Sequence, residues 1–487
     1  HSRILLRNVC DKTHAAFGAM AGAAVRAPIV IADSRADNDG EGNVISGHNS
    51  DPDNSIGIYN FIAFGTIIQG NRVGIGVSGS PIPNSRGILD QDFGTLIGGA
   101  SGNGRNVISG NAGTGIEVSG PGTDIFGNYI GVNSIGTAAI GNGGVGIDVF
   151  AGDVDLGSTF PGDANVISGN GSHGVFADGD SKAGNSFVIA VGNQIGLAAN
   201  GLTAIGNNGD GIFVNGFSFG VIEDNRIANN VVGVKLVNGV SFNINGNEIH
   251  GNGMLGIDLG GDGPTINDTG DGDSGPNSLI NFPTISSAVF DGGNLSVNGS
   301  IDVNSTDAGN VLVEIFVSSA CDSSGFGEGE RLAGVFEVTT DGNGDAIFSQ
   351  SFSPLTAVNP GDVLTATGTS QGFKGGFKLA APEGDFPLDT SEFSPCVPIS
   401  FPSAEIALTA DGAPDPVDAG QNITYTYMVV NNGTDDAPST VFQTSTPNNT
   451  TFVSFSAPGW SVEAPSPGGT GPITASSTLT VNAGVQT

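Results

Sequence analysis

Short segments of alternating hydrophobic and polar residues recur between residues 43 and 259. One of them is an Asn-x-Ile element, as in NVISGN at 106 and NEIHGN at 247. This period-two alternation predicts short β-strands. TIIQGN at 66 fits the same element with Thr in place of Asn, so we expect eight copies. The other seven begin at Asn43, Asn106, Asn128, Asn165, Asn193, Asn225 and Asn247.

A second element, Gly followed by alternating apolar residues, trails each copy of the first. Its copies are GIYNF at 57, GIGVS at 74, GIEVS at 115, GIDVF at 146, GVFAD at 174, GIFVN at 211, GVKLV at 233 and GIDLG at 256. In the shortest units a third strand is visible, as TDIFG at 123, GVIED at 220 and SFNIN at 241. Three strands in about 22 residues predict one coil of a parallel β-helix.

The alternation also assigns side chains to the two faces of each strand. In Asn-x-Ile both the Ile and the Asn point inward, because residues two apart share a face. The asparagines are therefore expected to stack as an internal ladder, in which each amide bonds to the next. A buried amide without a partner costs about 1–3 kcal/mol. We interpret the ladder as structural.

Longer alternating strands replace the repeat from about residue 283, as in VLVEIFVSS at 311 and DVLTATGTS at 362. They predict an antiparallel β-sandwich. The chain is thus predicted to be all-β: a parallel β-helix over 31–282 with eight or more coils, a β-sandwich over 283–402, and a further module over 403–487. Residues 1–30 differ in composition and are interpreted as a signal-peptide remnant, a fragment end or an artificial addition.

Charge excludes several classes of partner. The 487 residues contain 14 Lys and Arg against 48 Asp and Glu, a formal net charge of −34. Such a chain repels phosphate backbones, so no nucleic-acid partner is expected. No window approaches 18 uninterrupted apolar residues, and we expect no transmembrane segment. The composition favours an extracellular or cell-surface location, where Cys321 and Cys396 could form a disulfide; two buried thiols are the alternative.

Several phrases resemble a known family, the bacterial extracellular right-handed parallel β-helix repeat proteins. They are NVISGN, the segments at 127–142 and 192–207, and the exit sequence at 256–285. The resemblance covers about half of the chain, implies the right-handed fold, and specifies a fold better than a function. The segment from CDSSGFGEGERLAG to TSEFSPC resembles the β-sandwich that often follows such helices. Residues 404–487 resemble the immunoglobulin-like module of bacterial surface proteins, in a copy that looks incomplete.

Outward positions on the Gly-led strand form the most informative row. Adjacent rungs lie about 4.8 Å apart, so Glu117 and Asp148 approach the short carboxyl separation of retaining glycosidases. Neighbouring Phe rings could stack on sugar faces. The alternative is a solvated face in which Lys235 pairs with Asp258 and loops cover the rings. In order, the row is predicted to contain Gly76, Glu117, Asp148, Phe176, Phe213, Lys235 and Asp258.

The outward row of the Asn-x-Ile strand offers a second candidate site. Arg226 and Glu248 are expected to form an ion pair, and with His250 they could supply the base and charge neutraliser of a polysaccharide lyase. The alternative is an ion pair that has no catalytic role. His173 is interpreted as a loop residue. The whole row is expected to contain Val44, Ile67, Val107, Tyr129, Val166, Gln194, Arg226 and Glu248.

Calcium is the one cofactor that the sequence suggests. Asp262, Asp268, Asp271 and Asp273 crowd into a Gly-rich loop, and calcium prefers carboxylate and carbonyl oxygens on flexible turns. A solvated acidic turn is the alternative. A similar cluster precedes the first coil, at Asp33, Asp37, Asp39 and Glu41.

Three functions remain open from sequence alone. The first is a secreted or cell-surface bacterial protein whose β-helix presents a repetitive face for binding or adhesion to glycans or other surface polymers. The second is an extracellular polysaccharide-degrading hydrolase or lyase that uses the same face. The third is a self-assembling subunit of an extracellular fibre, since exposed strand edges favour association.

Overall fold

A computed structural model describes residues 30–32, 43–49, 55–61, 64–100, 104–150, 152–179, 187–216, 219–238, 241–370, 389–433, 435–477 and 480–482. The chain divides into two compact units. The first contains His1–Ala288 and Gly293–Ile399, and the second contains Val289–Gly292 and Ser400–Thr487. The second acidic cluster, Asp33 to Glu41, lies outside the described residues.

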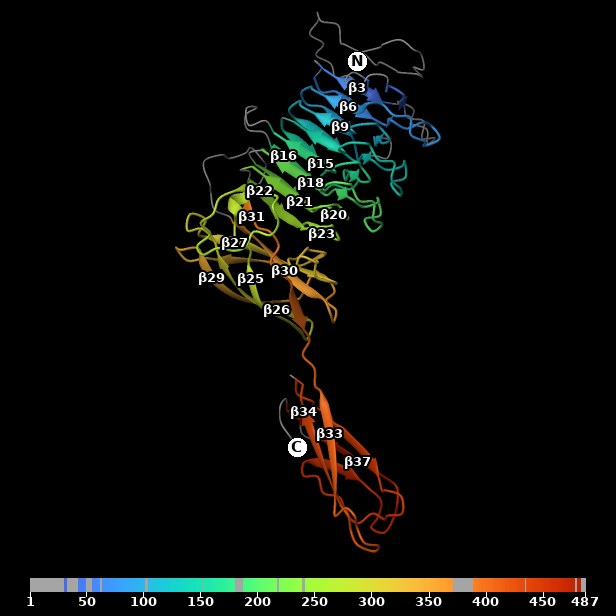
Figure 1. Ribbon diagram of the computed structural model, residues 1–487, viewed down its shortest axis with the longest axis vertical. Coiled ribbons are helices and arrows are strands. Elements are labelled where there is room, and N and C mark those ends of the chain that lie inside the picture. Colours follow the sequence, from blue (N-terminus) through green and yellow to red (C-terminus); the bar gives the residue numbers. More distant parts are fainter. Residues whose placement is uncertain are drawn as a thin grey trace, which may run out of the picture. The chain divides into compact units, whose positions relative to one another are not determined.

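The repeat region folds as the predicted parallel β-helix of eight coils, in which each coil gives one strand to each of three eight-stranded sheets (Figure 1). The first sheet contains β1 (Val30–Ala32), β4 (Ile67–Gln69), β7 (Leu96–Gly98), β10 (Thr123–Phe126), β13 (Val154–Leu156), β16 (Phe187–Val191), β19 (Phe219–Glu223) and β22 (Ser241–Asn245). The second contains β2 (Val44–Ile45), β5 (Arg72–Val73), β8 (Val107–Ile108), β11 (Tyr129–Ile130), β14 (Val166–Ile167), β17 (Gln194–Ile195), β20 (Arg226–Ala228) and β23 (Glu248–His250). The third contains β3 (Ile56–Asn60), β6 (Arg86–Asp90), β9 (Ile116–Val118), β12 (Ile147–Val149), β15 (Val175–Asp178), β18 (Ile212–Asn215), β21 (Val234–Val237) and β24 (Ile257–Leu259).

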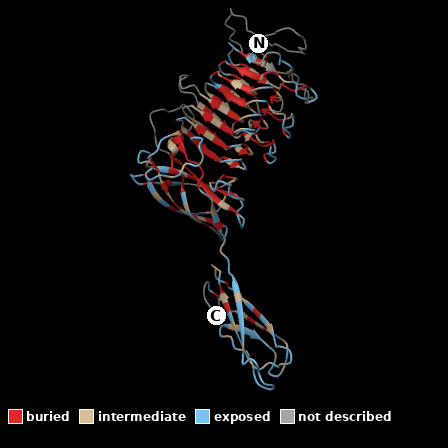
Figure 2. Cartoon of the chain, in the orientation of Figure 1, coloured by how far each residue is buried: buried red, intermediate tan, exposed pale blue. Residues whose placement is uncertain are grey.

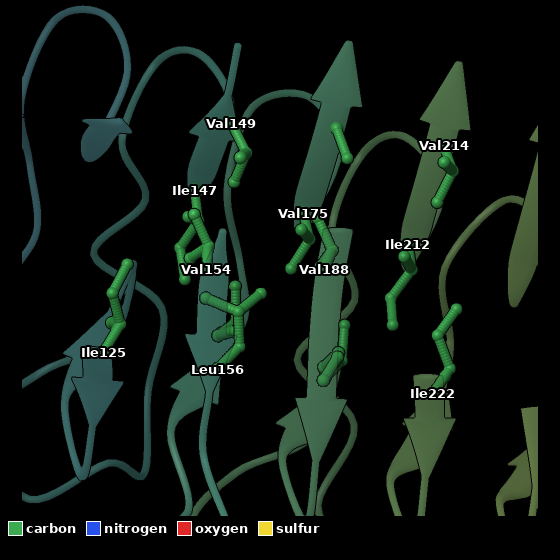
Figure 3. Packing of buried hydrophobic residues seen from close by; sticks show 14 of the residues in the cluster. Ile125, Ile147, Val149, Val154, Leu156, Val175, Val188, Ile212, Val214 and Ile222 are labelled. Atoms are coloured by element: carbon green, nitrogen blue, oxygen red, sulfur yellow. The ribbon is translucent and has the colours of Figure 1, made fainter. Parts of the chain in front are cut away.

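The interior of the β-helix is a continuous column of aliphatic side chains. Ile147 and Val149 of β12 face Val154 and Leu156 of β13 across it, and all four are fully buried (Figure 3). The same inward positions recur in every coil because residues two apart on a strand share a face. The strands of the β-helix are accordingly mostly buried along its length (Figure 2).

Two asparagine ladders run beside this column. In each, the side-chain Nδ2 donates to the Oδ1 of the next asparagine at 2.8–3.3 Å. The first ladder confirms the prediction and contains Asn43, Asn71, Asn106, Asn128, Asn165, Asn193, Asn225 and Asn247. The second was not predicted and contains Asn84, Asn111, Asn142, Asn170, Asn207, Asn230 and Asn252.

Two assignments in the early coils were wrong. Ile67 belongs to β4 in the first sheet, so Asn71, not Thr66, heads the element in that coil, and Arg72 takes the outward place assigned to Ile67. GIGVS at 74 is not a strand of the third sheet, because its Ile75 forms an antiparallel bridge with Pro81 in an inserted loop.

Inserted loops of this kind cover part of the second sheet. Bridges Val132 to Ala139 and Leu197 to Ala204 close two more of them. Their apolar residues pack against outward-facing side chains and form a second buried cluster. Val107, Tyr129 and Val166 therefore point outward as predicted, yet are buried.

Most of the antiparallel region that follows belongs to the first unit. Its strands are β25 (Thr284–Asp291), β26 (Asn294–Asp302), β27 (Asn310–Ser318), β28 (Arg331–Thr339), β29 (Asp345–Phe352), β30 (Val363–Ser370), β31 (Asp389–Thr390) and β32 (Val397–Ser400), after the short 3-10 helix η1 (Pro276–Leu279). They form an eight-stranded sheet. Cys321 and Cys396 form a disulfide bond.

This antiparallel region satisfies the open strand edges of the last coil. In the first sheet, the backbone N–H of Ile244 donates to the hydroxyl of Thr390 at 2.9 Å. In the second, the N–H of Ile249 donates to the carbonyl of Gly329 at 2.8 Å. In the third, the N–H of Leu259 donates to the carboxyl of Glu392 at 2.8 Å. The β-helix is therefore closed at this end by the chain itself, as exposed edges require.

The second unit is built from two small antiparallel sheets. One pairs β33 (Ile406–Ala413) with β34 (Thr424–Asn431). The other has the order β35 (Val441–Ser445), β37 (Pro472–Ser477), β36 (Trp460–Glu463). Across the part of the chain that the structure describes, no helix has the length and apolar character needed to cross a bilayer.

Candidate functional site

The candidate site is a row of outward side chains on the third sheet, which we call the outer row. Strand register places its members directly beside one another on successive coils, while their neighbours in each strand point into the core. Leu89 of β6 occupies the place predicted for Gly76, which lies in the inserted loop described above. The outer row contains Tyr59, Leu89, Glu117, Asp148, Phe176, Phe213, Lys235 and Asp258.

Glu117 and Asp148 lie side by side on β9 and β12, as predicted. Their surroundings differ. Arg86 of β6 donates from Nη1 to both carboxyl oxygens of Glu117, at 3.0 and 3.2 Å. Asp148 is only 8% exposed, and its Oδ1 is buried without a hydrogen-bond partner among the described residues. One carboxylate is thus held in an ion pair, and the other is buried without one.

Burial raises the pKa of Asp148 to about 7. The nearby carboxylates of Glu117 and Asp178 contribute to this rise, and His173 and Arg86 act in the opposite direction. A carboxyl group in this state holds its proton close to neutral pH. Two neighbouring carboxyl groups in unlike environments are the usual arrangement of an acid and its partner carboxylate.

Three rings follow the carboxyl pair along the outer row. Phe176 and Phe213 have ring centroids 5.1 Å apart, and His173 lies 5.5 Å from Phe176 and 5.2 Å from Phe213. All three are half-buried, so each exposes part of its ring. A face of this kind, built from rigid rings on a sheet, can stack on a flat apolar ligand surface.

His173 is a loop residue, as predicted, but sequence reasoning missed its place against these rings. The backbone N–H of Asp210 donates to Nδ1 of His173 at 3.0 Å. Nδ1 therefore accepts, and the proton of the neutral ring sits on Nε2. The carboxylate of Asp210 lies 3.4 Å from the same Nδ1, but that contact is an ion pair only when the ring is protonated. The available signal was position, since His173 and Asp210 both directly precede the glycine that leads their strand.

Lys235 ends the aromatic part of the outer row. Its Nζ lies 3.8 Å from Asp258, 3.9 Å from Asp210, and 5.9 Å from the ring centroid of Phe213. Asp258 is buried, which raises its pKa, and Lys235 acts against that rise. The pairing of Lys235 with Asp258 is the one expected for a structural face, so these two residues carry little evidence for ligand binding.

The second candidate site forms the expected ion pair. Nε of Arg226 lies 2.7 Å from Glu248, and His250 is on the same outward face of β23. Burial lowers the pKa of His250, while Glu330 and Glu248 raise it. The structure thus brings the three residues together and pairs two of them. Lyase chemistry at this place stays a prediction.

The acidic loop gathers three of the four residues named for calcium. One carboxylate oxygen from each of Asp268, Asp271 and Asp273 lies within 4.8 Å of the others. Asp262 is not in this group and instead lines a cleft of about 310 Å³ with Leu259. Both carboxyl oxygens of Asp271 already accept backbone N–H groups, from Asn281 and Asn304. Calcium binding stays a prediction.

No protein-family model, curated protein or solved structure matches this chain. The parallel β-helix and the antiparallel region after it stand on the structure itself. The bacterial origin and the immunoglobulin-like nature of the last module stay predictions.

Proposed function

We propose that this chain is an extracellular or cell-surface protein, of bacterial type, that binds polysaccharide along the outer row. The observation that carries the proposal is the cluster of Phe176, Phe213 and His173 on the outside of the third sheet. Sugar rings present flat C–H faces that stack on aromatic rings, and hydroxyl groups bond to carboxylates beside them. Glu117 and Asp148 lie next to the rings to accept such bonds.

The geometry of the fold suits a polymer better than a small molecule. Equivalent outward positions repeat along the β-helix axis at intervals of about 4.8 Å. A linear chain lying along the axis would meet the carboxylates and then the rings. Extended repeat surfaces of this kind commonly bind extended ligands.

Two features support the extracellular location. Cys321 and Cys396 form a disulfide bond, and disulfides persist mainly in oxidising compartments. The net charge of −34 keeps such a chain soluble and repels nucleic acid and anionic membrane surfaces.

Self-assembly through the last coil of the β-helix, the third function considered, has less support than polysaccharide binding. The edges of the last coil already bond to Thr390, Gly329 and Glu392 of the same chain. A second chain could not add a strand at that end without displacing these contacts.

The test is a binding assay with insoluble and soluble polysaccharides. The double variant Phe176→Ala and Phe213→Ala should lose binding at least tenfold and stay folded, because half-buried outward rings add little core volume. The matched control is Phe187→Ala with Phe219→Ala. Those rings also lie outward on adjacent coils, 6.4 Å apart, but on the first sheet. Equal binding by wild type and the Phe176 and Phe213 variant would contradict the proposal.

A further inference from the structure

The carboxyl pair of the outer row contains a feature that binding does not require. Asp148 lies between Glu117 on one neighbouring strand and Phe176 on the other. Its Oδ1 is buried and has no hydrogen-bond partner among the described residues. Leaving a buried carboxyl oxygen unpaired costs free energy, and a catalytic role is one of the explanations for such a group in a folded protein.

The surroundings of this group favour its protonated form. The pKa of Asp148 is raised to about 7, first by burial and then by the carboxylates of Glu117 and Asp178. His173 and Arg86 are the two cationic or titratable groups that act against the rise. Near neutral pH a large share of Asp148 therefore carries a proton beside the carboxylate of Glu117.

We propose that the outer row is also a hydrolytic site, in which Asp148 is the general acid and Glu117 is the nucleophile for a glycosidic bond. The inference depends on the binding function proposed above, because the rings of Phe176 and Phe213 hold the polymer in place. Carboxyl groups on adjacent rungs are about 4.8 Å apart at the backbone, close to the short separation found in retaining glycosidases.

The reaction balances with water as the co-substrate. The carboxylate of Glu117 attacks the anomeric carbon while the bond from that carbon to the glycosidic oxygen breaks, and Asp148 gives its proton to the leaving oxygen. Water then attacks the glycosyl ester, Asp148 takes a proton from the water, and Glu117 is released as a carboxylate. Arg86 holds the Glu117 carboxylate in position through both oxygens.

Charge identifies the substrate class as an uncharged polysaccharide. The chain carries a net charge of −34, and Glu117, Asp148 and Asp178 are all acidic groups at the site. Arg86 and Lys235 are already paired with carboxylates of the protein. A polyanion such as pectate or alginate would be repelled, whereas a neutral hexose or pentose polymer would not.

The experiment uses the full chain on cellulose, xylan, mannan, laminarin, pectate and alginate, with binding and released reducing ends measured in parallel. Wild type should release reducing ends from a neutral polymer that it binds, with a rate that falls above about pH 7 as Asp148 loses its proton. Glu117→Gln and Asp148→Asn should each lower the rate at least about 100-fold while binding persists. Glu117 is partly exposed, so Glu117→Gln remains informative if Asp148→Asn proves unstable.

The matched control is Asp155→Asn on the first sheet. Asp155 also faces outward beside a second carboxylate, Asp124, and its pKa is raised to about 6, first by burial. This variant should keep full activity.

Binding by wild type without hydrolysis of any bound neutral polymer overturns the catalytic inference and leaves the binding function standing. Undiminished hydrolysis by Glu117→Gln overturns the assignment of the pair. Absence of binding to every polymer overturns both proposals.

Discussion

Glu328 accepts hydrogen bonds from both the backbone N–H and the side-chain Nδ2 of Asn252, through one oxygen, at 3.0 and 2.9 Å. From Asn111 to Asn230, each rung of the second ladder makes the same pair of bonds to the Oδ1 of the next asparagine, as between Asn230 and Asn252. A glutamate of the antiparallel region thus takes the place of the asparagine that a further coil would supply.

The first prediction concerns Glu328 as the acceptor at the end of the second ladder. Glu328→Ala leaves Asn252 and the N–H of Gly251 without their acceptor. We expect a loss of about 3 kcal/mol of unfolding free energy, because buried donors without partners cost about 1–3 kcal/mol each. Urea unfolding measures it. Glu330→Ala, two residues away at a half-buried place, should cost less than about 1 kcal/mol; equal losses for the two variants would mean that Glu328 does not terminate the ladder.

The second prediction tests the inward register. Ile167 is fully buried and pairs with Ile130 and Ile195 on the neighbouring coils. Ile167→Asp places a charge in the apolar column and should cost at least about 4 kcal/mol. Gln194→Asp, at an outward position one coil further on and beside Arg226, should cost less than Ile167→Asp. Thermal unfolding followed by circular dichroism compares them, and an unchanged melting temperature for Ile167→Asp would refute the register.

The third prediction is that the protein is more stable in mild acid than at alkaline pH. Burial raises the pKa of Asp148, Glu314 and Glu392 to about 7, and that of Asp155 and Asp271 to about 6. A carboxyl group with a raised pKa binds its proton more tightly in the folded state. Its contribution to stability is present below the ordinary range near pH 4 and is lost as pH rises to about 7. Melting temperature should therefore fall between pH 5 and pH 8.

His250 acts in the opposite direction, because its lowered pKa favours folding at higher pH. His250 is one group against the five carboxyls named above, so we expect stability still to fall as the pH rises. Glu314→Gln should flatten the dependence, since an amide keeps an acceptor for the N–H of Gly246 and does not titrate. A melting temperature that rises steadily from pH 5 to pH 8 would contradict the prediction.

The fourth prediction concerns calcium at Asp268, Asp271 and Asp273. If the loop binds the ion, millimolar calcium should raise the melting temperature relative to chelator, by mass action on the folded state. Asp268→Asn with Asp273→Asn should abolish that rise. Asp262→Asn should not, because Asp262 lies outside the group of three. Identical melting curves with calcium and with chelator would exclude calcium from this loop.

Much of the fold could be predicted because every coil repeats the same physical environment. Inward isoleucines and the asparagines of the first ladder recur at fixed places. The seven copies of the Asn-x-Ile element therefore predict the strands even where a single copy is irregular. The strand assignment was wrong in the early coils, because the inserted loop around Ile75 has the same composition as the repeated strand element. The burial of Tyr129 was also hidden, because residues of inserted loops, among them Val132 and Ala198, pack around it.

The carboxyl pair and the two phenylalanines could be placed from register alone. Arg86 and His173 could not be placed in that way. Arg86 lies at the start of β6, and the sequence analysis had given the place of this strand to GIGVS at 74. His173 reaches the rings from a loop, where the period-two rule says nothing about side-chain direction.

The asparagine ladders have a last consequence for how the chain finds its fold. Each rung offers its neighbours the same amide group. The ladder hydrogen bonds therefore do not distinguish one coil from the next. A coil that stacked one place too early would meet nearly the same partners. A group that occurs once in the stack, such as the Glu328 carboxylate at Asn252, therefore fixes the position of its coil among otherwise similar coils.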